Sequence, residues 1–171
     1  MTESSLLKTT IVVMGVSGCG KSTVARQLAE RLGWPMAEGD DFHPVANKAK
    51  MAAGTPLTDE DRRPWLESLR DWIDRQPSHA ILTCSALKRS YRDILRAARG
   101  RIRFLHLDGS PHVLGQRMAA RKGHFMPAAL LLSQLETLER LGPDEDGTVV
   151  DIDATESEIV DLALQRLRLP V

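Results

Sequence analysis

The sequence predicts an α/β fold in which a parallel sheet of five strands lies between two layers of helices. Short apolar runs alternate along the chain with longer segments whose apolar residues recur at helical spacing. This alternation is typical of a parallel sheet covered by helices on both faces. A glycine-rich loop also stands between the first strand and the first helix. A length of 171 residues suits one hydrophobic core, so we expect residues 1–171 to form a single domain.

The composition argues against several classes of partner. Twenty-three basic and 23 acidic residues cancel and no basic tail is present, which is unlike a dedicated nucleic-acid binder. No apolar run approaches the length of a membrane span, and the first residues lack the features of a signal peptide. Two cysteines, Cys19 and Cys84, are too few for a disulfide framework. We therefore expect a cytoplasmic protein that binds neither nucleic acid nor a membrane.

The first strand and the first helix frame a phosphate-binding motif. Residues 9–14 are a β-branched apolar run, and helical spacing continues from Val24 to Leu32. Between them, GVSGCGKS fits G-x-x-x-x-G-K-[ST], the P-loop. Backbone N–H groups of such a loop surround phosphate oxygens, Lys21 reaches the β- and γ-phosphates, and the Ser22 hydroxyl binds Mg²⁺. The expected contacts of the nucleoside triphosphate are Gly15, Val16, Ser17, Gly18, Cys19, Gly20, Lys21, Ser22 and Thr23.

The second strand ends in a cluster of acidic residues. Residues 34–41 predict a short strand that finishes at Glu38, Asp40 and Asp41. Ligand groups of open α/β sheets gather at the carboxyl ends of the strands, so these acids are expected beside the phosphates. The alternative is an exposed acidic turn without a role in binding.

A polar insert of about residues 41–63 follows the second strand. It contains a short helix over residues 46–53, and then Thr58 and Asp61 match the capping pattern of a helix start. Pro64 is expected at the first position of a helix, where its missing N–H has no cost. The apolar residues of that helix recur on one face, namely Trp65, Leu66, Leu69 and Ile73.

Three further strands complete the expected sheet. Residues 79–85 are an apolar run that we expect to be the central strand, and residues 101–107 and 148–153 predict the fourth and fifth strands. The intervening helices are expected around Tyr91, over residues 111–121 and over residues 130–138, and Thr155 with Glu158 caps the last helix.

The remaining motifs favour a kinase of small molecules among P-loop proteins. The chain lacks the N-K-x-D signature of guanine-selective GTPases, and its third strand ends in Thr83-Cys84-Ser85 without a Walker B aspartate. Mg²⁺ is therefore expected at Ser22, phosphates and waters, with Glu38 or Asp40 acting through water. Arg117 and Arg121 stand one helical turn apart and predict a cationic lid, at about residues 117–128, that closes on the triphosphate. The alternative is a pair of arginines on a solvated helix face.

Several long motifs resemble those of the gluconokinase family. They run in the family's order from the P-loop nearly to the C-terminus. They comprise GDDFHP (39–44), Asn47, Lys50-Met51, PLTDxDRxPWL (56–66), CSALK (84–88), YRD (91–93), Arg117, RKGHF (121–125) and VDID (150–153). One position departs from the pattern: Glu38-Gly39-Asp40 stands where many relatives have Asp-Gly-Asp, which leaves the role of Glu38 in holding Mg²⁺ open.

The resemblance implies a fold, a reaction and an assembly. The implied fold is that of nucleoside-monophosphate kinases, with strand order 2-3-1-4-5. The implied reaction is ATP + D-gluconate → ADP + 6-phospho-D-gluconate, and the implied assembly is a homodimer. Two alternatives stay open: a shikimate-kinase-like enzyme, and a nucleotide-binding regulator with vestigial catalytic residues.

Roles can be assigned to the expected site residues. Asp40 orients the gluconate C6 hydroxyl and accepts its proton, while Lys21 neutralises the triphosphate. Arg121, together with Arg117, stabilises the charge of the transition state. Gluconate carries a carboxylate and a row of hydroxyls, which need cations and side chains that donate and accept hydrogen bonds. The candidate contacts are His43, Lys50, Arg62, Ser85, Lys88 and Arg92, although Arg62 could equally be a structural partner of Asp59 or Asp61.

Overall fold

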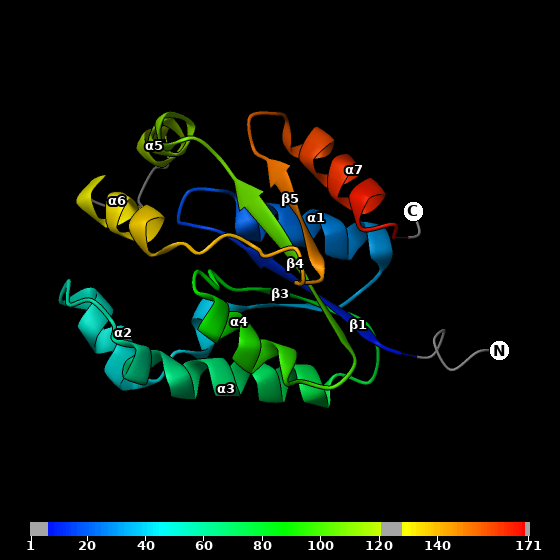
Figure 1. The fold of residues 1–171 in the computed structure, drawn as a ribbon, viewed down its shortest axis with the longest axis horizontal. Helices are drawn as coiled ribbons and strands as arrows, with labels where there is room; N and C mark the ends of the chain where they lie inside the picture. Colours follow the sequence, from blue (N-terminus) through cyan, green and yellow to red (C-terminus); the bar gives the residue numbers. More distant parts are fainter. Residues whose placement is uncertain (1–6, 121–127, 170–171) are drawn as a thin grey trace.

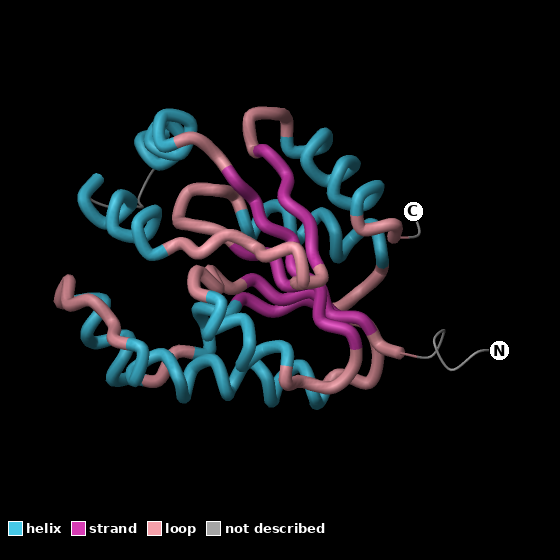
Figure 2. The backbone as a smooth tube through the Cα atoms, in the orientation of Figure 1, coloured by secondary structure: helices cyan, strands magenta, loops and turns pink. Residues whose placement is uncertain are grey.

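The computed structural model describes residues 7–120 and 128–169. Its centre is a sheet of five parallel strands in the order β2-β3-β1-β4-β5 (Figures 1 and 2). The strands are β1 (Thr9–Met14), β2 (Met36–Glu38), β3 (Ala80–Thr83), β4 (Arg101–Asp108) and β5 (Gly147–Asp151). The predicted parallel sheet and its strand order are confirmed.

The middle strand of the sheet is β1, so the expectation that residues 79–85 form the central strand was wrong. β1 pairs with β3 on one side and with β4 on the other, while β3 lies between β2 and β1. Both β1 and β3 are apolar runs buried on both faces of the sheet. Apolar composition identifies a strand as an interior one, but it does not show which of several interior strands lies in the middle of the sheet.

Alternate residues of β1 face two separate hydrophobic layers. Ile11 and Val13 pack in the layer formed by α1 (Lys21–Leu32) and α7 (Glu156–Arg166). Val12 and Met14 pack in the opposite layer, formed by α3 (Asp59–Arg75) and α4 (Arg89–Arg96). Figure 1 shows these two helix pairs on opposite faces of the sheet. The molecule therefore has the three layers that the sequence predicts.

The remaining elements lie at the end of the sheet where the strands finish. They are a 3₁₀ helix η2 (Gly39–Phe42), α2 (Val45–Ala52), α5 (Pro111–Ala120) and α6 (Ala128–Thr137). β2 ends at Glu38, and the predicted strand over residues 34–41 therefore turns into η2 before Asp40. Glycine is required at the turn, because a Cβ on Gly39 would lie 2.1 Å from the carbonyl oxygen of Thr83.

Helix α3 begins at Asp59, so Pro64 lies inside the helix and not at its first position as the sequence suggested. The start is fixed by a capping box, in which the Asp61 N–H donates to Thr58 Oγ1 (3.1 Å) and the Thr58 N–H donates to Asp61 Oδ2 (3.0 Å). Pro64 cannot donate to the carbonyl of Glu60, but Glu60 is exposed and water can satisfy that group. The predicted capping pattern is thus confirmed, and it takes precedence over the proline.

Among residues 7–120 and 128–169, no helix combines the length and the apolar character that crossing a membrane requires. The predicted lid over residues 117–128 lies largely outside the described residues, since residues 121–127 are not described.

Candidate active site

The P-loop connects β1 to α1 and turns its backbone toward the start of the helix. Gly20, the residue before α1, has a φ of +90°, which a glycine adopts without strain. Lys21 Nζ donates to the carbonyl oxygens of Gly15 (2.9 Å) and Val16 (3.1 Å), so the ammonium group lies over the loop. The N-terminus of α1 points its free N–H groups and its positive dipole at the same place. The loop can therefore hold a chain of phosphates.

A carboxylate from β2 contacts the P-loop. Glu38 Oε2 accepts hydrogen bonds from Ser22 Oγ (2.9 Å) and from Thr83 Oγ1 (2.6 Å). These residues come from the ends of β2 and β3 and from the first turn of α1, and they meet at one edge of the sheet. A hydroxyl and a carboxylate are the oxygen donors that Mg²⁺ prefers, so this arrangement fits a magnesium ion held partly through water. Within the described ranges, no group of three or more His, Cys, Asp or Glu residues could hold a metal by itself.

Sequence reasoning missed Thr83, because it treated the end of the third strand only as lacking an aspartate. The Thr83 hydroxyl donates to Glu38 and also accepts from the Gly39 N–H (3.2 Å). Thr83 is buried and therefore fixes the direction of the Glu38 side chain. One feature could have identified Thr83 as a site residue, namely its position as the last residue of a strand that pairs with β2.

Asp40 lies two residues after Glu38, at the start of η2, and faces solvent. Its side chain is 93% exposed, and its Oδ1 is 4.0 Å from Nε2 of His43. His43 is buried and stacks on Trp65 with ring centroids 4.1 Å apart, and burial is the main reason that the pKa of His43 is lowered. A neutral imidazole whose Nδ1 accepts from Asn47 Nδ2 (3.3 Å) carries its proton on Nε2, on the side of Asp40. His43 can thus support Asp40, while the Asp40 carboxylate remains open to a ligand.

Two of the predicted cations are paired with carboxylates at the start of α3. Lys50 donates to both oxygens of Asp61 (3.0 and 2.8 Å), and its hydrogen bonds are the first cause that lowers the pKa of Asp61 to about 2. Lys88 donates to both oxygens of Asp59 (3.0 and 3.3 Å). Both ion pairs are partly exposed, so a ligand anion could compete for either lysine.

Arg62 pairs with neither Asp59 nor Asp61, which corrects the structural alternative raised for it. Its Nη1 donates to the carbonyl oxygen of Leu57 (2.7 Å) and to Tyr91 Oη (3.2 Å). Two lysines, one from α2 and one at residue 88, pair with these two aspartates in the first turn of α3. Arg62 is half-buried, and its guanidinium lies over the Tyr91 ring, 5.5 Å from the centroid.

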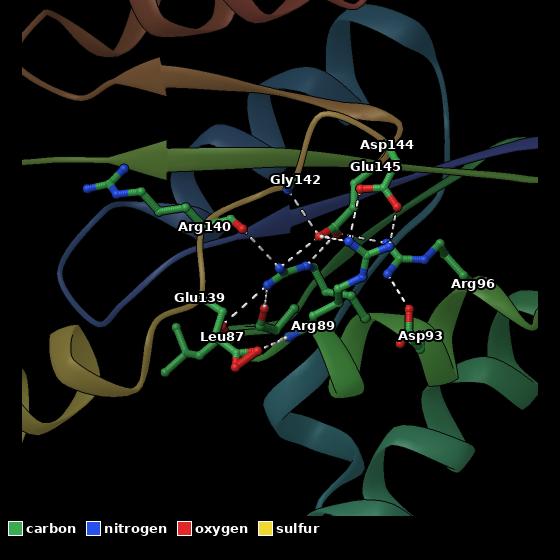
Figure 3. A network of polar contacts seen from close by, with 11 residues as sticks. Leu87, Arg89, Asp93, Arg96, Glu139, Arg140, Gly142, Asp144 and Glu145 are labelled. Carbon is green, nitrogen blue, oxygen red and sulfur yellow. Dashed lines mark hydrogen bonds and ion pairs between the residues drawn. The ribbon is translucent and has the colours of Figure 1, made fainter.

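Arg92 does not face the site, although the sequence places it among the candidate ligand contacts. Its side chain is fully buried, and it donates through Nε (2.7 Å) and Nη2 (3.0 Å) to the carboxylate of Glu145 (Figure 3). A guanidinium enclosed in this way cannot also bind a ligand. Ser85, by contrast, lies beside the P-loop, since its carbonyl oxygen accepts from the Gly15 N–H (3.2 Å).

On the other side of the P-loop, α5 and the segment after β5 line an open cavity of about 640 Å³. Arg117 lines this cavity and donates to the carbonyl oxygens of Ile152 and Ala154. A Cβ on Gly20 would lie 3.7 Å from Arg117 Nη1, so the guanidinium is close to the P-loop. The sequence did not indicate the other lining residues, which are Val113, Gln116, Ala120, Asp153, Ala154, Thr155 and Glu158. Arg121 falls outside the described residues.

Helix α6 also touches the P-loop. Gln134 Oε1 accepts a hydrogen bond from the Ser17 N–H (2.8 Å). The sequence indicated no function for Gln134, because the leucines around it predict only an apolar helix. The contact joins the helix that follows residues 121–127 to the loop that would hold phosphates.

The fold and the site together define the class of the protein, which is a P-loop kinase of the small α/β type. A family model described as "AAA domain" matches residues 11–141. A gluconokinase from Gluconobacter oxydans is 56% identical over 147 residues, which cover 84% of this chain and 83% of the relative. The crystal structure of a gluconokinase from Sinorhizobium meliloti is 48% identical, with a TM-score of 0.88 over 95% of this chain and 93% of that chain.

The chain belongs to the gluconokinase family. The alternative of a shikimate-kinase-like enzyme can be compared with the crystal structure of a shikimate kinase from Aquifex aeolicus. That structure is 18% identical, with a TM-score of 0.60 over 93% of this chain and 96% of that chain. At that level of identity the likeness shows a common fold alone.

Proposed function

We propose that this protein phosphorylates D-gluconate at its C6 hydroxyl with ATP, giving ADP and 6-phospho-D-gluconate. The observation that supports the proposal is the hydrogen bond from Ser22 of the P-loop to Glu38, which stands two residues before Asp40. This chain is also 56% identical to a gluconokinase over 84% of its length. Fold neighbours related to shikimate kinase are far more distant in sequence.

Asp40 is the proposed base and orienting group. Its carboxylate faces solvent, so it can accept the hydrogen bond of a hydroxyl that enters from that side. As the hydroxyl oxygen bonds to the γ-phosphorus, Asp40 takes the proton and the bond from phosphorus to the ADP oxygen breaks.

The triphosphate is bound by backbone N–H groups of the P-loop and by Lys21. Lys21 now donates to two carbonyls of its own loop, and these bonds can be exchanged for phosphate oxygens. Ser22 and Glu38 would hold Mg²⁺, which supplies charge neutralisation to the phosphates when it is bound. Arg117 and Arg121 are proposed to stabilise the transition state, and Arg117 also lines a cavity of a size suited to the nucleoside.

The acceptor is proposed to bind between η2, the start of α3 and residues 84–88. This region carries exposed carboxylates and cations that could meet the hydroxyls and the carboxylate of a sugar acid. The proposed contacts are Asp40, His43, Lys50, Arg62, Ser85 and Lys88. We also propose a homodimer, which the resemblance to gluconokinases implies, and a location in the cytoplasm, because free cysteines and an ATP-dependent reaction suit that compartment.

The proposed reaction is tested by ADP release from purified protein with ATP, Mg²⁺ and a panel of acids. The panel contains gluconate, shikimate and other sugar acids of equal charge. Release stimulated by gluconate alone supports the proposal, and stimulation by shikimate alone favours the shikimate-kinase-like alternative. No stimulation by any acid, together with retained ATP binding, indicates the nucleotide-binding regulator.

A further inference from the structure

A buried ion pair joins three segments that are distant in the sequence. Arg92 of α4 and Glu145, which precedes β5, are both almost fully enclosed, with side chains 0% and 1% exposed. Figure 3 shows Glu145 in this network together with Leu87 and Arg140 of the neighbouring loops. Arg92 Nη1 donates to the carbonyl oxygens of Ala86 (2.9 Å) and Leu87 (3.3 Å), and Nη2 also donates to that of Arg140 (3.4 Å). The pair thus attaches residues 84–88 to the segment after α6.

Residues 84–88, which we call the acceptor loop, have a backbone conformation that their sequence disfavours. Ala86 has a φ of +46°, in the left-handed region, and is fully buried. For a residue other than glycine this conformation is unfavourable, so it persists only where surrounding contacts determine it. The two hydrogen bonds from Arg92 reach the carbonyl of Ala86 and that of the following residue, which is where such a contact is needed.

The acceptor loop reaches the site at both of its ends. The carbonyl of Ser85 accepts from the P-loop at Gly15, and Lys88 donates to Asp59 at the start of α3. A rotation of the peptide at Ala86 would therefore move Ser85 and Lys88 relative to one another. Further contacts of the loop are the Cys84 N–H with the carbonyl of Val13 (3.1 Å) and the Glu139 N–H with the carbonyl of Leu87 (2.7 Å).

A purely stabilising role explains this pair poorly. A buried ion pair loses the hydration of both charges, and apolar replacements of similar volume are often equally stable. Burial raises the pKa of Glu145, but hydrogen bonds from Arg92 and Arg96 outweigh it and hold this pKa at about 2. The carboxylate is therefore charged at neutral pH. A charged Glu145 fixes the position of Arg92 and thereby the conformation of the loop that Arg92 contacts. This explains the pair better than a gain in the free energy of unfolding does.

We propose that Arg92 and Glu145 are positioning residues for the phosphoryl acceptor, because they hold the acceptor loop in the left-handed conformation that presents Ser85 and Lys88. The inference rests on the proposed function, since it takes those two residues as acceptor contacts. Arg92 would thus influence the binding of the acceptor without contacting it.

Arg96 provides a matched control on the same helix. Its Nη1 donates to Glu145 Oε2 (2.9 Å), so it shares the carboxylate with Arg92. In the described part of the chain, its other hydrogen bond goes to Asp93 and none goes to the carbonyls of the acceptor loop. Arg92→Lys and Arg96→Lys therefore both keep a positive charge near Glu145, while only the first removes the bonds to the loop.

The experiment compares steady-state kinetics of the two variants with those of the full-length wild-type chain. A lysine keeps the charge but places its donors on one nitrogen, so it lacks the planar fork by which Nε, Nη1 and Nη2 of Arg92 reach Glu145 and the loop carbonyls in different directions. Arg92→Lys is expected to raise KM for gluconate about tenfold, the effect of losing one or two hydrogen bonds, with KM for ATP changed less than about twofold. Arg96→Lys is expected to leave both constants within about twofold. Equal effects of the two variants, or equal shifts in both KM values of Arg92→Lys, would overturn the proposal.

Ala86→Gly tests the conformational part of the inference. Glycine adopts positive φ without strain, so this change in the Arg92→Lys background is expected to return KM for gluconate part of the way to the wild-type value. A double variant whose KM stays at the level of Arg92→Lys contradicts the role of the left-handed conformation.

Two further measurements keep the result interpretable. If Arg92→Lys does not fold, as judged by circular dichroism, Glu145→Gln replaces it, since glutamine keeps the shape and one acceptor oxygen. Glu145→Gln is expected to raise KM for gluconate selectively, and an unchanged KM overturns the proposal. Wild-type ADP release with gluconate tests the proposed function separately. If another acid proves to be the acceptor, the same comparison of variants is made with that acid.

Discussion

The two halves of the site are built in different ways. The nucleotide half consists of contiguous residues 15–22 whose backbone groups, helix terminus and one lysine point at the phosphates. The acceptor half consists of side chains from distant segments that hold one another in pairs, such as Lys88 with Asp59 and Lys50 with Asp61. Backbone geometry is set locally and carries no titratable group, whereas the paired side chains depend on tertiary packing and on ionised carboxylates. The acceptor half should therefore be the more sensitive of the two to substitution of residues outside the site and to acid.

The largest effect is expected from the predicted lid that closes on the nucleotide half. Arg121→Ala should lower kcat about 10³-fold, because a cation that meets charge developing on the transferred phosphoryl group contributes at that scale. The measurement is steady-state ADP release at saturating ATP and gluconate. A variant that changes only KM for ATP shows that Arg121 binds the ground state and has no special role in the transition state.

Asp40→Asn should have the next largest effect and should separate the two halves. Turnover is expected to fall on the order of 10²-fold or more, because the amide cannot accept the proton. ATP binding, measured by calorimetry, should stay close to that of the wild type, since Asp40 makes no contact with the P-loop in the described residues. Turnover within a factor of a few of the wild-type value contradicts the role of Asp40. Asp41→Asn is the matched control on the same 3₁₀ helix and should keep near-normal turnover.

Thr83→Val probes the point where the two halves meet. The substitution keeps the shape of the side chain but removes the hydroxyl that orients Glu38 (2.6 Å). The Mg²⁺ concentration for half-maximal activity is expected to rise about tenfold, as is usual for loss of a residue that orients a metal-binding group. An unchanged magnesium dependence shows that Glu38 is fixed by Ser22 alone, or that Glu38 takes no part in holding the ion.

The smallest effect is expected in the acid dependence of stability. The pKa of Glu145 is about 2 in the folded chain against an ordinary value of 4.5. A carboxyl whose pKa is depressed on folding stabilises the fold above the ordinary value, and this contribution is lost as the pH falls from about 4.5 toward 2. The free energy of unfolding of the wild type should thus decline more steeply over this range than that of Glu145→Gln. The difference is at most about 1.4 kcal/mol per pH unit, the value for one proton. Parallel pH profiles from urea unfolding contradict this linkage.

The sequence by itself determined the nucleotide half and most of the fold. A P-loop between a β-branched run and a helix needs no distant partner, so strand, loop and helix were predicted together and lie where expected. The capping box at Thr58 was equally local and is confirmed. The strand order came from a resemblance to a family and not from periodicity, which explains why the apolar run at residues 79–85 could be mistaken for the middle strand.

Only the tertiary structure decided which charged residues of the acceptor half face a ligand. Arg62, Lys88 and Arg92 lie in similar polar stretches, yet Arg92 is enclosed against Glu145, 53 positions further along the chain. Thr83 likewise acquired a role only because β2 lies beside β3 and brings Glu38 to it. The physical reason is the same in both cases. Local sequence fixes backbone dihedrals and helix ends, whereas burial of a charge and the partner that compensates it depend on chain segments that meet only after folding.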